Sequence, residues 1–201
     1  GSITFEGQEI QPQDHRIYLT FVGREVAWIS QHASLSFNNR RKINKHYQHL
    51  VKNQGQQAAN FRPLEECLEM VGLLPEKVVN KYPFELSGGM MQLVGVALAL
   101  ASRPKLLLAD EPTSALDVLS KMKLLRLLSQ LHEEEKMAIL FVTHDISVAE
   151  HLAQKVVVMK EGQIVESGPA HQILRHPEQA YTQKLLKAVP KLAEFREREQ
   201  L

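Results

Sequence analysis

Alternating strand and helix patterns in the second half of the chain constrain its fold more than any other feature. Residues 105–110 (KLLLAD) are a short apolar run with a polar end, typical of a buried strand, and Ala138–Val142 (AILFV) is another such run. Between them, leucines recur at helical spacing from Leu124 to Leu131. Strands that alternate with helices pair in parallel and carry the helices on the faces of the sheet. The pattern therefore predicts an α/β fold with a parallel sheet core.

The first half of the chain combines short strand patterns with a long helical stretch. The strand patterns cover residues 3–5, 17–22 and 26–30, and a polar turn at 11–14 separates the first two. From about residue 31 to 101 only helical patterns occur: an amphipathic helix with a basic face around 40–52, a short helix at 64–71 and an almost wholly apolar helix at 89–101. This stretch predicts a helical subdomain inserted in the α/β core.

The predicted organisation has four parts. They are an N-terminal β region (1–31), the helical subdomain (32–101), a core (102–168) and a C-terminal helical tail (169–201). Within the core, residues 147–154 have a helical pattern, and two strands at 155–159 and 163–165 flank the turn Glu161-Gly162.

Composition excludes several classes of protein. Lys and Arg total 24 against 23 Asp and Glu, so bulk charge offers no argument for a nucleic-acid-binding protein. The single cysteine, Cys67, excludes a disulfide framework and a four-cysteine metal site, and its place on an apolar helix face predicts a buried core residue. No apolar run reaches the roughly 20 residues of a membrane-spanning helix.

The segment Leu86-Ser87-Gly88-Gly89 directly precedes the apolar helix. Free backbone N–H groups, a serine hydroxyl and the positive end of the helix dipole together suit an anion, and glycine lets the backbone approach it closely. The alternative is an ordinary helix cap with glycines in a turn. Taken alone, this segment is better interpreted as an ordinary helix cap than as an anion site.

Polar residues follow three of the apolar strands. Asp110 and Glu111 end one strand, where ligands of parallel sheets bind, so Asp110 could hold Mg²⁺ and Glu111 could polarise a water. A pair of capping acids before Pro112 is an equally good interpretation of those two residues by themselves. His144 and Gln31 also follow strands, and each alone would more often be an ordinary surface or cap residue.

The ordered set of these motifs is specific. Five motifs occur in a fixed order along the chain: Gln31, LSGG, an apolar strand ending in Asp-Glu, Ser114-Ala115-Leu116-Asp117 and His144. With this ordered set, the chain resembles the nucleotide-binding subunit of an ATP-binding cassette (ABC) transporter over nearly its whole length. By this resemblance Gln31 is the Q-loop residue, Leu86–Gly89 the signature, 106–110 the Walker B strand, Glu111 the catalytic glutamate, 114–117 the D-loop and His144 the switch histidine. More narrowly, the chain is similar to the ATPases of oligopeptide, dipeptide and nickel importers, on the segments QHASLSFN (31–38), YPFE (82–85), ADEPTSALD (109–117), and the His176-Pro177, Tyr181-Thr182 and 188–190 residues of the tail.

The resemblance implies a P-loop NTPase-like (RecA-like) core and a mechanism. Two cassettes stack head to tail around two ATP molecules, and Ser87, Gly88 and Gly89 would bind the γ-phosphate of the partner's nucleotide. Gln31 and Asp110 would contact Mg²⁺, Glu111 would orient the hydrolytic water, and His144 would stabilise charge on the γ-phosphate. Asp117 would bridge the two sites. Dimer closure and ATP hydrolysis would then drive import of peptides, nickel or metal chelates.

The resemblance also implies partners and a location. These are integral-membrane permease subunits, a second nucleotide-binding subunit that is identical or homologous, and indirectly an extracytoplasmic substrate-binding protein, with no nucleic acid. The chain would work peripherally at the cytoplasmic face of the cell membrane. Soluble cassette proteins of DNA repair or translation are a third interpretation, but the coiled-coil insertions, zinc cysteines and second cassette that they usually carry are not visible here.

One family element is missing from the sequence. No G-x-x-x-x-G-K-[ST] phosphate loop occurs in the 201 residues, although that loop normally supplies most phosphate contacts. We therefore expect an N-terminally truncated cassette that alone binds ATP poorly, hydrolyses it negligibly and has low solubility. The alternative function is a catalytically incompetent cassette that only docks to a membrane or paralogous partner.

Overall fold

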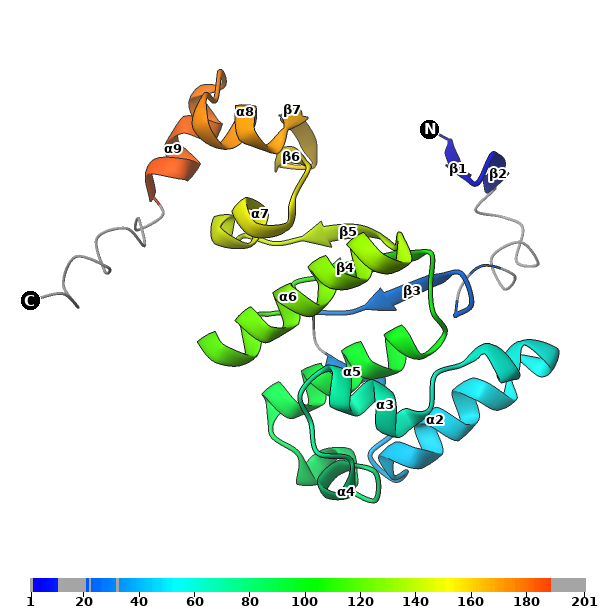
Figure 1. Ribbon diagram of the computed structural model, residues 1–201. Helices are drawn as coiled ribbons and strands as arrows, with labels where there is room; N and C mark the ends of the chain where they lie inside the picture. Colours follow the sequence, from blue (N-terminus) through cyan, green and yellow to red (C-terminus); the bar gives the residue numbers. More distant parts are fainter. Residues whose placement is uncertain (1, 11–20, 22, 32, 189–201) are drawn as a thin grey trace, which may run out of the picture. The chain divides into compact units, whose positions relative to one another are not determined.

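The computed structural model describes residues 2–10, 21, 23–31 and 33–188, and the chain divides into two compact units, 1–142 and 143–201 (Figure 1). The predicted division into four parts has boundaries at other positions, and it remains a prediction.

The first unit contains a parallel three-stranded sheet. Its strands are β3 (Val26–Ile29), β4 (Leu106–Asp110) and β5 (Ala138–Val142), in the order β3-β4-β5. Ile29 pairs with Ala109, and Ala109 pairs with Phe141. Side chains of a strand alternate between the two faces, and Ala27, Ile29, Leu107 and Ala109 are all buried. The predicted α/β fold with a parallel sheet is confirmed.

A small antiparallel hairpin precedes the sheet. Strands β1 (Ile3–Phe5) and β2 (Gln8–Ile10) pair through a two-residue turn in which Glu6 and Gly7 have φ angles of 49° and 79°. The strand at 3–5 is confirmed, whereas β2 has no apolar pattern and was not predicted. The predicted turn at 11–14 lies outside the described residues, and so does most of the predicted strand at 17–22.

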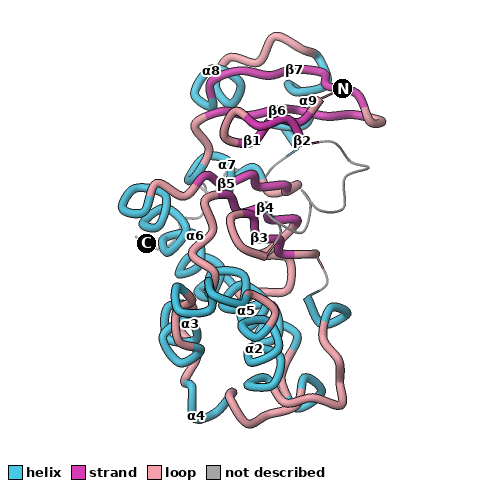
Figure 2. The backbone as a smooth tube through the Cα atoms, turned by 90° about the vertical axis from the view of Figure 1, so that its right-hand side faces the viewer, coloured by secondary structure: helices cyan, strands magenta, loops and turns pink. Residues whose placement is uncertain are grey.

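Only helical elements connect β3 to β4 in the described part of the chain. They are η1 (Ala33–Ser36), α2 (Ile43–Lys52), η2 (Gly55–Asn60), α3 (Leu64–Met70), α4 (Pro75–Val78), η3 (Pro83–Glu85) and α5 (Gly88–Ala101). Figure 2 shows α2, α3, α4 and α5 gathered at one end of this unit, beyond the strands. Their apolar faces form a core with Ile43, Leu68, Val78, Val94 and Leu100 fully buried. The helices predicted at 64–71 and 89–101 are confirmed. The helix with the basic face is also present, but it begins at Ile43, so the three cations at 40–42 precede it.

Helix α6 (Val118–Glu135) connects β4 to β5. Leu124, Leu128 and Leu131 lie on its buried face at helical spacing, as predicted. The helix ends at Lys136, whose φ of 58° places it in the left-handed region that terminates many helices. Strand β5 then begins two residues later.

The second unit is built on an antiparallel pair. Strands β6 (Lys155–Lys160) and β7 (Gln163–Pro169) meet at the turn Glu161-Gly162, where both φ angles are positive (51° and 78°) as in a type I′ hairpin turn. Helices α7 (Ile146–Leu152), α8 (Ala170–Arg175) and α9 (Ala180–Ala188) complete this unit. The predicted strand pair and helix are confirmed. Among the described residues, no helix has the length and apolar character needed to cross a membrane.

Candidate nucleotide site

The carboxyl edge of the parallel sheet holds three of the predicted site residues. Ile29 pairs with Ala109, so Gln31 and Glu111 each lie two residues beyond the same register position. Asp110 is the last residue of β4 and pairs with Val142 of β5. The fold therefore brings an amide and two carboxyl side chains to one edge of the sheet, where parallel sheets bind ligands.

Glu111 has a constrained backbone at this edge. Its φ of 46° lies in the left-handed region, which costs a non-glycine residue about 1–3 kcal/mol. Its N–H donates to the carbonyl of Val142 (2.9 Å), and its carbonyl accepts from the N–H (3.2 Å) and the Oγ (3.0 Å) of Ser114. These bonds hold the turn after β4 in a fixed course. Strain of this kind clusters at functional sites because it presets a side chain's direction.

The signature turn lies exposed at the start of α5. Ser87 caps this 14-residue helix, with its Oγ accepting from the N–H of Met90 at 3.2 Å. Both Ser87 and Gly88 are exposed, and a Cβ atom added at Gly88 would meet nothing within 4 Å. The positive end of the helix dipole and the free N–H groups of the first turn are thus open to an anion. The helix-cap interpretation is correct, and it leaves the turn available for a ligand.

The signature turn also contacts the predicted D-loop. A Cβ atom at Gly89 would lie 3.0 Å from the carbonyl oxygen of Ala115 and 3.7 Å from Leu116 Cδ2, so only glycine fits this contact without a shift. The next residue, Asp117, caps α6 by accepting from the N–H (3.0 Å) and the Oγ (2.7 Å) of Ser120. The bond from the Ser120 N–H, with that from its hydroxyl, holds the pKa of Asp117 below its ordinary value.

Gln92 joins the signature helix to the Q-loop, a role that sequence reasoning missed. Its side chain is 2% exposed. Its Oε1 accepts from the N–H of Ala33 and its Nε2 donates to the carbonyl of Ser30, both at 3.4 Å. The two backbone groups lie on either side of Gln31. A single amide side chain inside an otherwise apolar helix was the signal that could have pointed to it.

His144 belongs to the second unit, and its predicted role stays a prediction. The next residue, Asp145, caps α7: its Oδ1 accepts from the N–H (2.9 Å) and the Oγ (2.6 Å) of Ser147. Its own N–H donates to Thr143 Oγ1 at 3.0 Å. The backbone around the histidine is therefore held by side-chain hydrogen bonds.

The residues of the first unit fit a phosphate and a hard cation. The open Gly88 leaves the room that an anion needs against backbone N–H groups. Mg²⁺ is commonly held by one or two carboxylates together with phosphate oxygens, a requirement that Asp110 with the Gln31 amide would meet. No cluster of three or more His, Cys, Asp or Glu side chains suited to a metal exists within the described ranges. A cation here would thus depend on the nucleotide for its remaining ligands.

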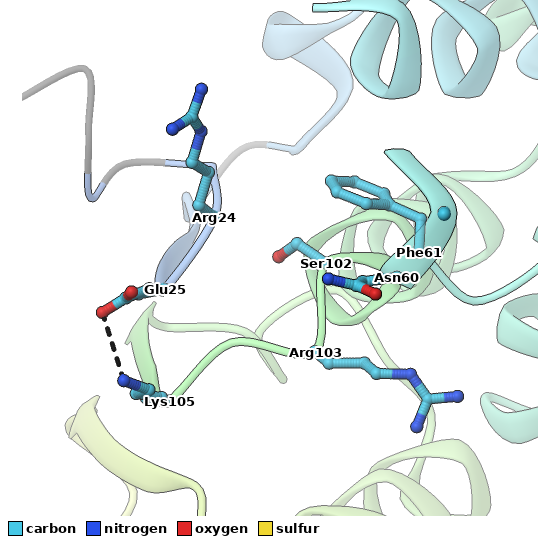
Figure 3. A pocket seen from close by; sticks show the side chains of 8 residues that line it. Arg24, Glu25, Asn60, Phe61, Ser102, Arg103 and Lys105 are labelled. Atoms are coloured by element: carbon cyan, nitrogen blue, oxygen red, sulfur yellow. Dashed lines mark ion pairs between the residues drawn. The ribbon is translucent and has the colours of Figure 1, made fainter. Parts of the chain in front are cut away.

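A cavity of about 570 Å³ lies at the other end of the same strands (Figure 3). Arg24 and Glu25 precede β3 and Lys105 precedes β4, so the cavity is at the amino edge of the sheet. The Nζ of Lys105 lies 3.4 Å from Glu25 Oε2, the ion pair drawn in the figure. None of the predicted site residues lines this cavity.

The chain matches known cassette proteins. The model of the ABC transporter family matches residues 1–114. The oligopeptide transport ATP-binding protein OppD of Bacillus subtilis (strain 168) is 41% identical over 203 residues, covering 99% of this chain and 56% of the relative. The dipeptide transport ATP-binding protein DppD of Escherichia coli (strain K12) is 39% identical over 199 residues, covering 98% and 61%. The chain therefore spans less than two thirds of the length of either relative.

Solved structures agree with the sequence relatives. The dimeric structure of MJ0796, a bacterial ABC transporter cassette, is similar with a TM-score of 0.74 and 26% identity, covering 85% of this chain and 73% of that one. A dimeric post-hydrolysis state of the same cassette, bound to ADP and Pi, has a TM-score of 0.73. With the parallel sheet, the exposed signature turn and the acidic edge of β4, these likenesses show that the chain belongs to the ABC transporter family.

Proposed function

We propose that the chain is the ATP-binding and ATP-hydrolysing part of an ABC importer, and that it supplies one half of a composite nucleotide site. The observation that carries the proposal is the exposed Ser87-Gly88-Gly89 turn at the start of α5, open at Gly88 and seated on the D-loop segment through Gly89. A signature turn buried against its own sheet would have no access to a nucleotide held by another subunit, whereas an exposed turn has that access.

Each residue has a role that the resemblance to ABC cassettes implies and that its chemistry fits. The N–H groups after Ser87, with its hydroxyl, would hold the γ-phosphate of ATP bound to the partner subunit. Asp110 and Gln31 would hold Mg²⁺, which neutralises phosphate charge when bound, and Glu111 would orient the attacking water. His144 would stabilise charge on the γ-phosphate, and Asp117 would link the two halves of the dimer.

The 201 residues contain no phosphate loop, which gives a second candidate function. Nucleotide at the signature turn has to be held on its other side by another segment that carries such a loop. In the second candidate the chain docks to a membrane or paralogous partner without hydrolysing ATP.

The names of the relatives support a proposal about the substrate class. Oligopeptide and dipeptide transport proteins are among the most similar, so peptides are the favoured cargo, with nickel or a metal chelate as alternatives. The partners would be permease subunits, a second cassette and, indirectly, an extracytoplasmic binding protein. The chain would then lie at the cytoplasmic face of the cell membrane.

The test is rescue of ATP hydrolysis in a mixed dimer. The partner is a cassette with an intact phosphate loop and a substituted signature serine, so its turnover depends on the signature of this chain. We expect the chain to restore turnover, and Gly88→Asp to reduce the rescue on the order of a hundredfold, because a carboxylate would face the γ-phosphate. Aspartate in the first turn favours the helix, so the variant should fold normally.

Gly162→Asp is the matched control, because it adds the same charge in an open hairpin turn of the second unit. The φ of 78° at this position strains an aspartate, so thermal unfolding first checks that the variant folds. The folded variant should rescue like the wild type. Equal rescue by Gly88→Asp and Gly162→Asp would overturn the proposal. A stable complex with the partner that gives no turnover even with the wild-type chain would favour the docking function instead.

A further inference from the structure

The positive charge of the chain is concentrated in one segment. The whole chain has a formal net charge of +1, yet no acidic residue occurs between Glu25 and Glu65. Every charged residue in that interval is a cation: Arg40, Arg41, Lys42, Lys45, Lys52 and Arg62. The remainder of the chain is therefore net acidic. An asymmetry of this size indicates a surface for an anionic partner.

Helix α2 carries two of these cations, Lys45 and Lys52, and Arg41 lies just before its start. One face of the helix is anchored: Ile43 is fully buried, and Tyr47 donates its hydroxyl proton to the carbonyl of Arg62 at 2.8 Å. The outer face carries a stripe of exposed polar side chains at spacings of three and four residues, which together line a shallow hollow of about 260 Å³: Arg41, Lys45, Gln48, His49 and Lys52. We call this set the basic stripe.

The basic stripe has little internal compensation. Lys45 Nζ donates to the neutral side chain of Gln48 at 3.0 Å. Across the part of the chain that the structure describes, no ion pair involves Arg41, Lys45 or Lys52. The helical part of the stripe, from Lys45 to Lys52, is about 10 Å long at 1.5 Å per residue. A row of long cationic side chains with so little compensation suits an extended anionic surface.

A pair of aromatic rings lies beside Lys42, the residue that follows the first member of the stripe. Lys42 Nζ lies 5.7 Å above the ring of Tyr82, which stacks on Phe84 with 5.4 Å between centroids. Phe84 is 70% exposed. Cations that reach phosphates beside an aromatic ring at the apolar boundary are the combination found where helices lie on lipid bilayers. A nucleic-acid surface would need a more basic chain than one with a pI of about 8.0.

We propose that the basic stripe of α2 binds the anionic headgroups of a lipid bilayer. The inference rests on the proposed function, because an importer subunit is held next to a membrane. Phosphatidylglycerol-type headgroups would supply the phosphate groups, and the stripe would orient the helical end of the first unit toward the bilayer surface. The attraction would be electrostatic and would fall with salt.

The test is co-flotation of the full chain with vesicles of phosphatidylcholine, alone or mixed with phosphatidylglycerol. In about 0.1 M KCl the wild-type chain should partition onto the anionic vesicles only. Binding to the anionic vesicles should be lost near 1 M KCl, where the Debye length falls to about 3 Å. The triple variant Arg41→Gln, Lys45→Gln, Lys52→Gln should partition about a hundredfold less.

The matched control removes three exposed cations elsewhere: Lys123→Gln, Arg126→Gln and Lys187→Gln. It has the same net charge as the stripe variant and should float like the wild type. Thermal unfolding of both variants checks that they fold. Equal flotation of the stripe variant and the control would overturn the proposal, as would equal binding to neutral vesicles.

One further outcome would assign the stripe to a different partner. If the stripe variant loses binding to a single-stranded RNA but floats with anionic vesicles as the control does, the stripe is a nucleic-acid surface and the proposal fails. The vesicles contain no permease, and the flotation assay contains no nucleotide. A failure of the chain to float therefore does not change the expected result of the Gly88→Asp test. Conversely, vesicle binding would survive a failure of the ATPase assay.

Discussion

Gln92 shows how one buried polar side chain can connect two motifs. It lies within the apolar helix α5, and its amide bonds to the backbone on both sides of Gln31. Gly95, three residues further along α5, approaches the same segment so closely that an added Cβ would be 3.0 Å from the Cβ of Ala33. The Q-loop and the signature helix therefore share one contact surface, and a displacement of α5 would act on the backbone at Gln31.

Replacing Gln92 by leucine should loosen this connection. Leucine has a similar size but leaves the Ala33 N–H and the Ser30 carbonyl without their partner, at a cost of about 1–3 kcal/mol in the free energy of unfolding. Urea denaturation measures the loss, and hydrogen exchange should be faster at the Ala33 amide. The exposed Gln130→Leu on α6 is the control, with an expected change within about 0.5 kcal/mol. Equal stabilities of the two variants would contradict the role given to Gln92.

Sequence reasoning at the residue scale succeeded where local chemistry was sufficient. Ser87 caps its helix, as a serine before two glycines suggests. Cys67 is fully buried as predicted, and its burial raises the pKa of the thiol to about 11. The partners of Gln92 were beyond reach, because Ala33 and Ser30 lie 59 and 62 residues away in the sequence. Long-range partners of a polar group depend on packing that no local pattern encodes.

At the scale of elements, Arg62 holds the carboxyl end of the signature helix. It is 2% exposed, and its Nη1 donates to the carbonyl of Leu100 at 2.8 Å while its N–H donates to that of Ala101 at 2.9 Å. Its Nη2 pairs with Glu135 at the end of α6. The last carbonyls of a helix lack intrahelical donors, and a cation there also opposes the negative end of the dipole. Arg62 thus connects the segment before α3 to α5 and α6.

Removing this guanidinium should be costly. Arg62→Met leaves the Leu100 carbonyl without its donor and Glu135 without its partner, so we expect a loss of about 2–4 kcal/mol in the free energy of unfolding. Arg62→Lys keeps the charge but not the planar fork, and it should lie between methionine and wild type. Chemical denaturation measures the series. Arg126→Met, at an exposed position of α6, is the control, and a methionine variant at position 62 as stable as this control would rule out the anchoring role.

The pattern of apolar residues predicted most helices and strands, but it missed short elements that have no apolar pattern. Strands β3, β4 and β5 and helix α5 follow from continuous apolar runs, and helices α2, α3, α6 and α7 follow from apolar residues at helical spacing. Strand β2 (QEI) has no such face. It forms because the turn at Glu6-Gly7 returns the chain onto β1, where backbone hydrogen bonds suffice. Three-residue strands and 3₁₀ turns are set by backbone geometry rather than by patterned burial.

At the scale of the whole molecule, the two faces of the parallel sheet differ. One face is buried through Ala27, Ile29, Leu107 and Ala109, as the fold requires. On the other face, Trp28 is 63% exposed, Leu140 59% and Val142 54%. Trp28 and Leu140 flank Leu108 in one register row, so the exposed apolar side chains are neighbours. A contiguous patch of this kind favours association.

This exposed face should govern self-association of the chain in solution. Leu140→Thr removes a central apolar side chain while keeping the β propensity of the strand, so it should weaken association about tenfold and lower the binding of a hydrophobic dye. Its cost in stability should stay near 0.5 kcal/mol because the position is exposed. Sedimentation equilibrium gives the association constant. Acrylamide quenching of Trp28, the single tryptophan, reports directly on the face.

Leu119→Thr makes the same chemical change on α6, at a side chain that is 74% exposed. It should leave association and dye binding unchanged, because Leu119 does not belong to the exposed row of Trp28 and Leu140 on the sheet. If both threonine variants weaken association equally, the effect follows total surface hydrophobicity rather than this face. A tryptophan that acrylamide quenches no better than a buried one would likewise show that the face is covered in solution, and burial of the Trp28–Leu140 row would then have to come from another part of the chain or a second copy.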